Sequence, residues 1–324
     1  MTLLVTGASG MLGGAVARLL RSRGESVRTF QRRASGITGV EDVAGSLGDP
    51  QAVKRAVEGV DSVIHCAAKV SFSGDPAEFE RVNVAGTHDL LEAAHFAGAG
   101  RFVYVSSPSV AHLGHSIIGA GAEPADPTRA RGDYARTKAK AEQLVLANDD
   151  DAMPVTAIRP HIVWGPGDTQ LVERVLSRAR AGRLPLLGGG TALVDTTYVD
   201  NAASAIVAAH DHIERVHGRP LVVTNGEPRP IGELLARICA AGGAPAPRMS
   251  VPAWLGRAAG TAVETLWRGS NADGEPPMTR FLAEQLSTAH WFDQRQTREL
   301  LDWTPAVSLD EGFARLAAHY GGRA

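Results

Sequence analysis

The sequence predicts an α/β protein, a doubly wound parallel sheet of the Rossmann type with a second, smaller and mostly helical substrate domain. Two observations carry this prediction. Short apolar runs rich in β-branched residues alternate with helical patterns through the first half of the 324 residues, as expected for parallel strands buried on both faces. The first strand and helix are joined by a turn that contains Gly7, Gly10 and Gly13.

The individual elements follow in chain order. Strands are expected at residues 3–8, 26–32, 39–46, 61–68, 101–107 and 155–164, with helices between them at 11–23, 50–58, 78–98 and 134–147. After Trp164 turn-rich segments interrupt the alternation, until a helix at 198–213 and a strand at 220–227 return to the sheet. We therefore expect a dinucleotide-binding domain at 1–164 and 198–226, and a substrate domain at 165–197 and 227–324.

Composition excludes several classes of protein. The formal net charge of -2 argues against a nucleic-acid binder that depends on bulk electrostatics. Two distant cysteines, Cys66 and Cys239, make a disulfide framework improbable and fit a reducing compartment. The N-terminus lacks a signal-peptide pattern and no run approaches the ~20 apolar residues of a membrane span, so we expect a cytoplasmic protein. His65 and Cys66 lack partners at metal-ligand spacing, and we expect no metal site.

The glycine turn predicts a dinucleotide site. The first glycine allows the tight turn, the second lets the backbone approach a pyrophosphate, and the third lets the helix pack on the strand. The helix that follows presents free N–H groups and the positive end of its dipole to an anion.

The spacing of this turn is G-x-x-G-x-x-G preceded by Thr6, and Tyr134 lies four residues before Lys138. With these features the chain resembles the extended short-chain dehydrogenase/reductases of the NAD-dependent epimerase/dehydratase superfamily. The resemblance covers nearly the whole chain and implies hydride transfer between a nicotinamide and a secondary alcohol or ketone. The other stretches that carry it are "HCAAKV", "NVAGT", "VYVSSPSVA", "IRPHIVWGPGD" and "WFDQRQTRELLDWTPAVSLDEGF".

The resemblance implies that Ser107, Tyr134 and Lys138 are catalytic. A phenol with its usual pKa near 10 is a poor base at neutral pH, and we expect the Lys138 ammonium to lower that pKa. Ser107 is preferred to Ser106 because Val110 then falls on the valine of the family pattern SSxxVxG.

The resemblance also implies which residues contact the coenzyme. His161 either lines the site or is a structural histidine, and Cys66 is interpreted as a small buried residue. Asn83 matches the family's asparagine that supports a backbone kink near the lysine. Besides Tyr134 and Lys138, the residues expected at the coenzyme are Thr6, Gly7, Ser9, Gly10, Met11, Leu12, Gly13, Gln31, Arg32, Arg33, Ser46, Leu47, Cys66, Ala67, Ala68, Asn83, Pro160, His161, Ile162 and Val163.

The end of the second strand indicates which coenzyme is preferred. Gln31 stands where NAD-preferring relatives carry an acid, so no carboxylate is expected there to repel a 2′-phosphate. Arg32 and Arg33 follow at once, and a guanidinium matches phosphate geometry. Ser46 replaces an adenine-side aspartate. We expect NADP(H) to be preferred, with NAD(H) as the alternative.

The substrate region is less specific. Residues 251–268 form an apolar lid, a membrane-surface face or plain core, and core is favoured. Arg280 is a candidate anchor for an anionic substrate, or else an exposed arginine. The stretch "EPPMTRFLAEQLSTAHWFD" resembles the 3β-hydroxysteroid dehydrogenase-like branch, and within it the reductases of bacterial long-chain olefin biosynthesis. That resemblance implies a bulky apolar 3-hydroxy or 3-keto substrate, either a 2-alkyl-3-hydroxyalkanoic acid or a steroid-like compound.

Two other functions stay open at this point. A nucleotide-sugar 4-epimerase with tightly bound NAD has the same fold, whereas Pro108 and Ser109 replace the acidic pair of a dehydratase. A non-catalytic coenzyme sensor or RNA-binding protein would not need the Ser-Tyr-Lys set.

Two partners are expected besides the small-molecule substrate. The first is a second copy of the chain, which would pair through helices at 78–96 and 134–147. Leu90, Leu91, Leu144 and Val145 would either form that contact or face the sheet. Other enzymes of a hydrocarbon pathway are the second expected partner.

Overall fold

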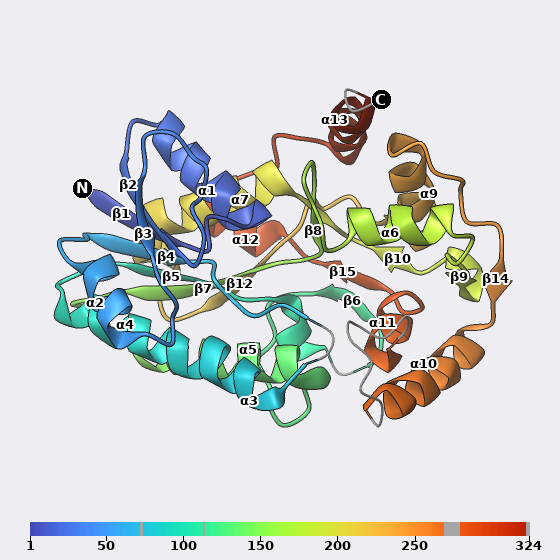
Figure 1. The fold of residues 1–324 in the computed structure, drawn as a ribbon, viewed down its shortest axis with the longest axis horizontal. Coiled ribbons are helices and arrows are strands. Elements are labelled where there is room, and N and C mark those ends of the chain that lie inside the picture. Colours follow the sequence, from blue (N-terminus) through green and yellow to red (C-terminus); the bar gives the residue numbers. More distant parts are fainter. Residues whose placement is uncertain (72–73, 113, 269–278, 322–324) are drawn as a thin grey trace.

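Seven parallel strands form the central sheet, in the order β12-β7-β5-β4-β1-β2-β3 (Figure 1). The computed structural model describes residues 1–71, 74–112, 114–268 and 279–321. The doubly wound order, with β1 and β4 at its centre, confirms the predicted fold class. The strands are β1 (Thr2–Thr6), β2 (Ser26–Gln31), β3 (Glu41–Ala44), β4 (Ser62–His65), β5 (Phe102–Val105), β7 (Val155–Pro160) and β12 (Pro220–Val223).

Helices cover both faces of this sheet because alternate strand residues point to opposite sides. In β5, Val103 and Val105 belong to one apolar cluster, and Phe102 and Tyr104 belong to the other. The first cluster packs against α1 (Met11–Ser22), α7 (Val199–Asp211) and α8 (Ile213–Val216), and the second against α2 (Pro50–Val57), α4 (Gly86–Phe96) and α5 (Gly132–Ala147).

The helix expected at 78–98 is divided into three parts. It begins as α3 (Pro76–Phe79), continues as the π-helix η1 (Glu80–Ala85) and becomes regular again in α4. Farther along, Leu90 and Leu91 lie in the core, as does Val145 of α5. These three side chains therefore face the sheet, and the homodimer stays a prediction.

The rest of the chain combines helices with short strands. A four-stranded sheet has the order β13-β10-β15-β6, and two short pairs join β8 to β11 and β9 to β14. The short strands are β6 (Ile117–Ala120), β8 (Val163–Trp164), β9 (Leu186–Leu187), β10 (Leu193–Val194), β11 (Thr197–Tyr198), β13 (Arg229–Pro230), β14 (Ser250–Val251) and β15 (His290–Phe292). The helices are η2 (Pro108–Ala111), α6 (Val172–Arg180), η3 (Gly188–Gly190), α9 (Ile231–Ala241), α10 (Ala253–Arg268), α11 (Arg280–Gln285), α12 (Arg295–Leu301) and α13 (Leu309–Gly321).

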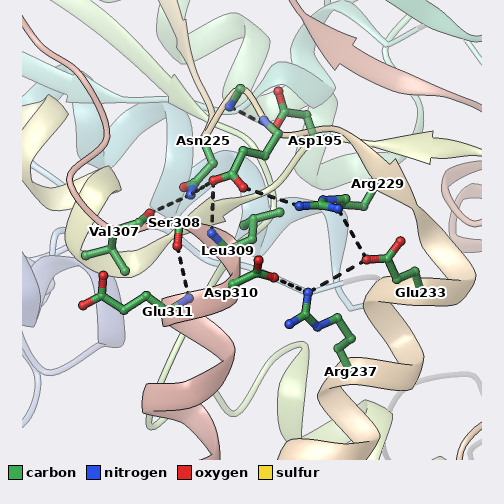
Figure 2. Close-up of polar contacts among 12 residues, drawn as sticks. Asp195, Asn225, Arg229, Glu233, Arg237, Val307, Ser308, Leu309, Asp310 and Glu311 are labelled. Carbon is green, nitrogen blue, oxygen red and sulfur yellow. Dashed lines mark hydrogen bonds and ion pairs between the residues drawn. The ribbon is translucent and has the colours of Figure 1, made fainter.

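Polar contacts hold the C-terminal segment against the end of the main sheet, and Figure 2 shows them. Asn225 Nδ2 donates to the carbonyl of Val307 at 2.9 Å. Arg237 of α9 forms ion pairs with Glu233 and with Asp310 of α13. The C-terminal helix is thereby attached to α9, which lines the cavity described below.

The stretch at 251–268 differs from its prediction. Trp254 and Leu255 of α10 are 71% and 44% exposed, so the interpretation of this region as plain core is wrong for these two side chains. Gly256 and Gly260 are buried instead, because a Cβ at either position would come within 2.7 Å of a neighbouring atom. Every helix in the described part of the chain is too short or too polar to span a bilayer. Residues 275–278, part of the branch-specific stretch, lie outside the described residues.

A buried ion pair fixes α5 to the sheet. Arg159 of β7 and Glu142 of α5 are each only 1% exposed, and Nε of the arginine donates to Oε2 of the glutamate at 2.8 Å. A further guanidinium N–H donates to the carbonyl of Glu123 at 2.7 Å. Since α5 also carries Tyr134 and Lys138, this pair positions the predicted catalytic helix.

We predict that Glu142→Gln lowers the free energy of unfolding by about 3–5 kcal/mol, because it leaves the arginine charge buried without its counter-ion. Urea unfolding followed by circular dichroism measures this loss. The control is Glu311→Gln, which breaks an exposed pair with Arg315 and should change stability much less. Equal losses in the two variants would contradict the prediction.

Candidate active site

The predicted site residues gather around one cavity of about 1070 Å³. It lies along the C-terminal ends of β1, β4, β5 and β7 and continues between α6, α9 and α11. Thr6 and Asn83 are the exceptions, since both are buried behind the cavity wall. The predicted residues that line it are Gly7, Ser9, Gly10, Met11, Leu12, Gly13, Gln31, Arg32, Arg33, Ser46, Leu47, Cys66, Ala67, Ala68, Ser107, Tyr134, Lys138, Pro160, His161, Ile162 and Val163.

The glycine turn has the geometry that a dinucleotide requires. Gly7 has a φ of +74°, and a Cβ there would come within 2.9 Å of Ala67 Cα. A Cβ on Gly13 would come within 2.5 Å of the Gly7 carbonyl oxygen, so only glycine allows the first turn of α1 to pack this closely. No side chain caps the N-terminus of α1. Its N–H groups therefore face the cavity and fit a pyrophosphate.

The adenosine end of the cavity differs from the sequence expectation in one respect. A carboxylate does lie beside Gln31, because Gln31 Nε2 donates to Asp42 Oδ1 from the neighbouring strand β3 at 2.8 Å. Burial raises the pKa of Asp42, but hydrogen bonds from Thr29, from Ser35 and from Gln31 outweigh it and hold that pKa below its usual value. The charge of Asp42 is thus held by three donor residues, and its side chain does not line the cavity.

The three predicted catalytic side chains meet at the end of β5. The Ser107 hydroxyl lies close enough to the Tyr134 phenol to lower its pKa, although burial acts more strongly in the opposite direction. Ser107 Oγ accepts from Ser109 Oγ at 2.9 Å and from the Ser109 backbone N–H at 3.3 Å. The Ser107 hydroxyl proton is therefore available to Tyr134 or to a substrate oxygen. Ser109, which the sequence analysis considered only as a replaced dehydratase acid, orients the serine.

Lys138 is buried one turn after Tyr134 on α5. Its Nζ donates to the Val105 carbonyl at 2.6 Å and lies 4.0 Å from the centre of the Tyr104 ring. Burial lowers the pKa of Lys138 to about 7, although Glu142 one turn further along acts in the opposite direction. Burial also raises the pKa of Tyr134 to about 12. The expectation that the ammonium lowers the phenol pKa is therefore not supported, because desolvation dominates at Tyr134.

A chain of buried hydrogen bonds connects the glycine turn to α5, and the sequence analysis missed it. His65 Nδ1 lies 2.7 Å from Thr6 Oγ1, and His65 Nε2 lies 3.0 Å from Thr87 Oγ1. Thr87 Oγ1 donates to the Asn83 carbonyl at 2.7 Å, and Asn83 Nδ2 donates to Thr137 Oγ1 at 3.1 Å. Thr6 and Asn83 thus support the site from behind.

The segment after β7 forms the wall opposite the glycine turn. His161 lines the cavity. Its Nδ1 also donates to the Asp195 carbonyl at 2.5 Å, so this histidine both lines the site and has a structural hydrogen bond. Ile162 has a φ of +44°, which is unusual for a β-branched residue. Backbone strain of this kind is found preferentially at functional sites. Cys66 lines the cavity as a thiol whose pKa is raised to about 12 by burial, so it stays protonated.

The far end of the cavity is lined by aliphatic residues together with Arg174 and Arg178 of α6 and Gln285 of α11. Arg280 does not line it, because its Nε donates to Glu284 Oε1 at 3.0 Å. The interpretation of Arg280 as a direct substrate anchor is therefore not supported. The aliphatic residues that line this end, from α6 to α11, are Val175, Leu184, Ile231, Leu234, Leu235, Ile238, Leu282 and Leu286.

A doubly wound sheet with a dinucleotide turn beside a Ser-Tyr-Lys group defines a dinucleotide-dependent enzyme. Residues 3–224 match the model of the NAD dependent epimerase/dehydratase family, and the chain belongs to that family.

Three known proteins resemble this chain over nearly its full length. A 2-alkyl-3-oxoalkanoate reductase of Stenotrophomonas maltophilia (strain K279a) is 43% identical and covers 98% of this chain and 99% of its own. A decarboxylating sterol-4-alpha-carboxylate 3-dehydrogenase of Mus musculus is 30% identical over 96% of this chain and 88% of its own. A short-chain dehydrogenase/reductase superfamily protein of Agrobacterium tumefaciens, solved with bound NAD, is 25% identical with a TM-score of 0.77, over 100% of this chain and 98% of its own.

We predict that Tyr134→Phe keeps the fold and coenzyme binding but lowers kcat by about 10²–10⁴-fold, because the proton donor is lost. Lys138→Ala should weaken coenzyme binding as well. Fluorescence titration with coenzyme and steady-state kinetics separate the two effects. A near-normal rate in the Tyr134→Phe variant would remove Tyr134 from the mechanism.

Proposed function

We propose that the protein interconverts 2-alkyl-3-oxoalkanoates and the corresponding 3-hydroxy acids with NADP(H). The chain is a hydride-transferring oxidoreductase that acts on a 3-oxo or 3-hydroxy compound, in line with its reductase and dehydrogenase relatives. One observation carries the finer proposal. The Ser107 and Tyr134 hydroxyls face a cavity whose far end is aliphatic, which suits a carbonyl compound with alkyl chains.

The roles of the side chains follow from their contacts. When bound, the nicotinamide supplies or accepts the hydride. Tyr134 donates its proton to the oxygen at carbon 3 during reduction and takes it back during oxidation. Ser107, oriented by Ser109, holds that oxygen with its free hydroxyl proton. Lys138, one turn after Tyr134 on α5, supplies positive charge to the site once a ligand favours its protonated form.

Both named relatives point to the same substrate chemistry. In a 2-alkyl-3-oxoalkanoate the carboxylate is attached to the carbon beside the reacting one, and a sterol 4-carboxylate oxidised at position 3 has the same relation. The nucleotide-sugar epimerase is less favoured, because the relatives at 43% and 30% identity are named as a reductase and a dehydrogenase.

The proposal is tested by oxidation of 2-alkyl-3-hydroxy acids of increasing chain length with NADP⁺. This direction avoids the spontaneous decarboxylation of the 3-oxo acid. We expect kcat/KM to rise about fourfold for each added methylene until the aliphatic end is filled, since one buried CH₂ contributes about 0.8 kcal/mol. A 3β-hydroxysteroid and UDP-glucose serve as comparison substrates. Epimerisation of UDP-glucose without oxidation of any hydroxy acid would overturn the proposal.

The preference for NADP(H) is supported by the rim of the cavity. Arg32 and Arg33 are exposed and line it. No ion pair or hydrogen bond joins their guanidinium groups to another residue in the described ranges. A 2′-phosphate would provide a counter-ion for both. Asp42, the nearby acid, is turned toward Gln31 and Ser35.

We predict at least a tenfold preference of kcat/KM for NADPH over NADH, since one charge-assisted pair contributes about 1.5–3 kcal/mol. Arg32→Ala should reduce this ratio mainly through the KM for NADPH. Arg55→Ala is the matched control, because Arg55 is exposed on α2 and does not line the cavity. Equal kcat/KM for the two coenzymes in the native enzyme would refute the assignment.

A further inference from the structure

His112 closes the short turn that begins at the catalytic serine. Ser107 precedes η2 and His112 follows it, with the His112 backbone N–H donating to the Ser109 carbonyl at 3.2 Å. The imidazole is only 2% exposed and lines the cavity. Neither ring nitrogen has a hydrogen-bond partner in the described part of the chain. Burying an unpaired N–H is unfavourable, so this ring is suited to a ligand that reaches it from the cavity.

The neighbouring histidine cannot take this role as a donor. His290 lies edge-on to His112, with ring centres 5.1 Å apart. Thr288 Oγ1 donates to the Glu284 carbonyl, so the same oxygen must accept from His290 Nε2 at 2.8 Å. The remaining nitrogen of a neutral His290, Nδ1, is therefore an acceptor. His112 is the ring that has an N–H left to offer.

The carboxylate nearest to His112 is neutralised by arginines. Glu284 of α11 faces the imidazole, and that carboxylate is paired with Arg280 at 3.0 Å and with Arg131 at 3.8 Å. Two guanidinium groups and one carboxylate leave one net positive charge. The other titratable groups around His112 are His115, His161 and the neutral His290.

We infer that His112 binds the carboxylate of the substrate, while Ser107 and Tyr134 hold the oxygen at carbon 3. The inference rests on the proposed function, in which the carboxylate is one carbon removed from the reacting centre. Because His112 ends the turn that Ser107 begins, both groups are placed by the same short segment. The enzyme then selects a 3-hydroxy acid over the same compound without its charge.

Protonation should accompany this binding. Burial lowers the pKa of His112 to about 4. A bound carboxylate favours the imidazolium and raises that pKa. At a pH between the pKa of His112 in the free enzyme and its pKa in the complex, binding therefore takes up a proton. The KM for the acid should therefore rise with pH in this range. The KM for its methyl ester should not show this rise. The ratio of the two KM values removes the effect of Tyr134 and Lys138 titration, because acid and ester share it.

The test compares a 2-alkyl-3-hydroxy acid with its methyl ester in the native enzyme, in His112→Gln and in His95→Gln. We expect His112→Gln to lower the acid-to-ester ratio of kcat/KM at least tenfold, as for the loss of a hydrogen bond to a charged group. His95→Gln is the matched control, because His95 is exposed on α4 and does not line this cavity. It should leave the ratio unchanged.

Different failures can be told apart. An unchanged ratio in His112→Gln, or equal pH profiles of KM for acid and ester in the native enzyme, would overturn the inference and leave the proposed function intact. The native pH profile needs no substitution, so it decides the matter even where the variant does not fold. A native enzyme that oxidises neither acid nor ester would overturn the proposed function, and the inference with it.

Discussion

The active site depends on the buried hydrogen bonds that run through His65. On one side the imidazole contacts Thr6 at the start of the glycine turn, and on the other it reaches Thr87 and, through it, Asn83. Because Thr87 Oγ1 donates to the Asn83 carbonyl, His65 Nε2 must donate to that oxygen and Nδ1 must accept. Burial, and then the charge of Lys138, lower the pKa of His65 to about 3. The connection between the glycine turn and α5 therefore stays neutral and intact at physiological pH.

Burial also lowers the pKa values of basic groups elsewhere in the cavity wall. Burial lowers the pKa of His161 to about 4 and of His290 to about 2, and it brings the pKa of Lys138 to about 7. The centre of the site thus carries little charge of its own. Charge is kept at the rim and behind the wall, where Arg32 and the Arg131–Glu284 pair lie. Under the proposed function, ligands with phosphate or carboxylate groups would supply the charge that the centre lacks.

Features that depend on short-range patterns could be predicted from the sequence. The glycine turn and the Tyr134–Lys138 spacing are local, and the strands follow from alternation within a few residues. The contact between Gln31 and Asp42 could not be predicted in this way, because it depends on the register of β2 against β3. The edge contact of His112 with His290 joins distant segments. Arg280 is different, since Glu284 four residues later was a visible partner.

The π-helix at Glu80–Ala85 gives this segment a length requirement that its composition does not reveal. A π-helix holds one residue more than the α-helix that would span the same distance. Deletion of a single residue here would restore regular α-helical pairing and remove the wide turn that carries Asn83, while the flanking helices keep their faces. Leu90 and Leu91 could then stay in the core, but Asn83 would lose the position from which it contacts Lys69 and Thr137. The segment therefore requires its length as well as its residue types, because the support of α5 and the packing of the sheet are separated by that one extra residue.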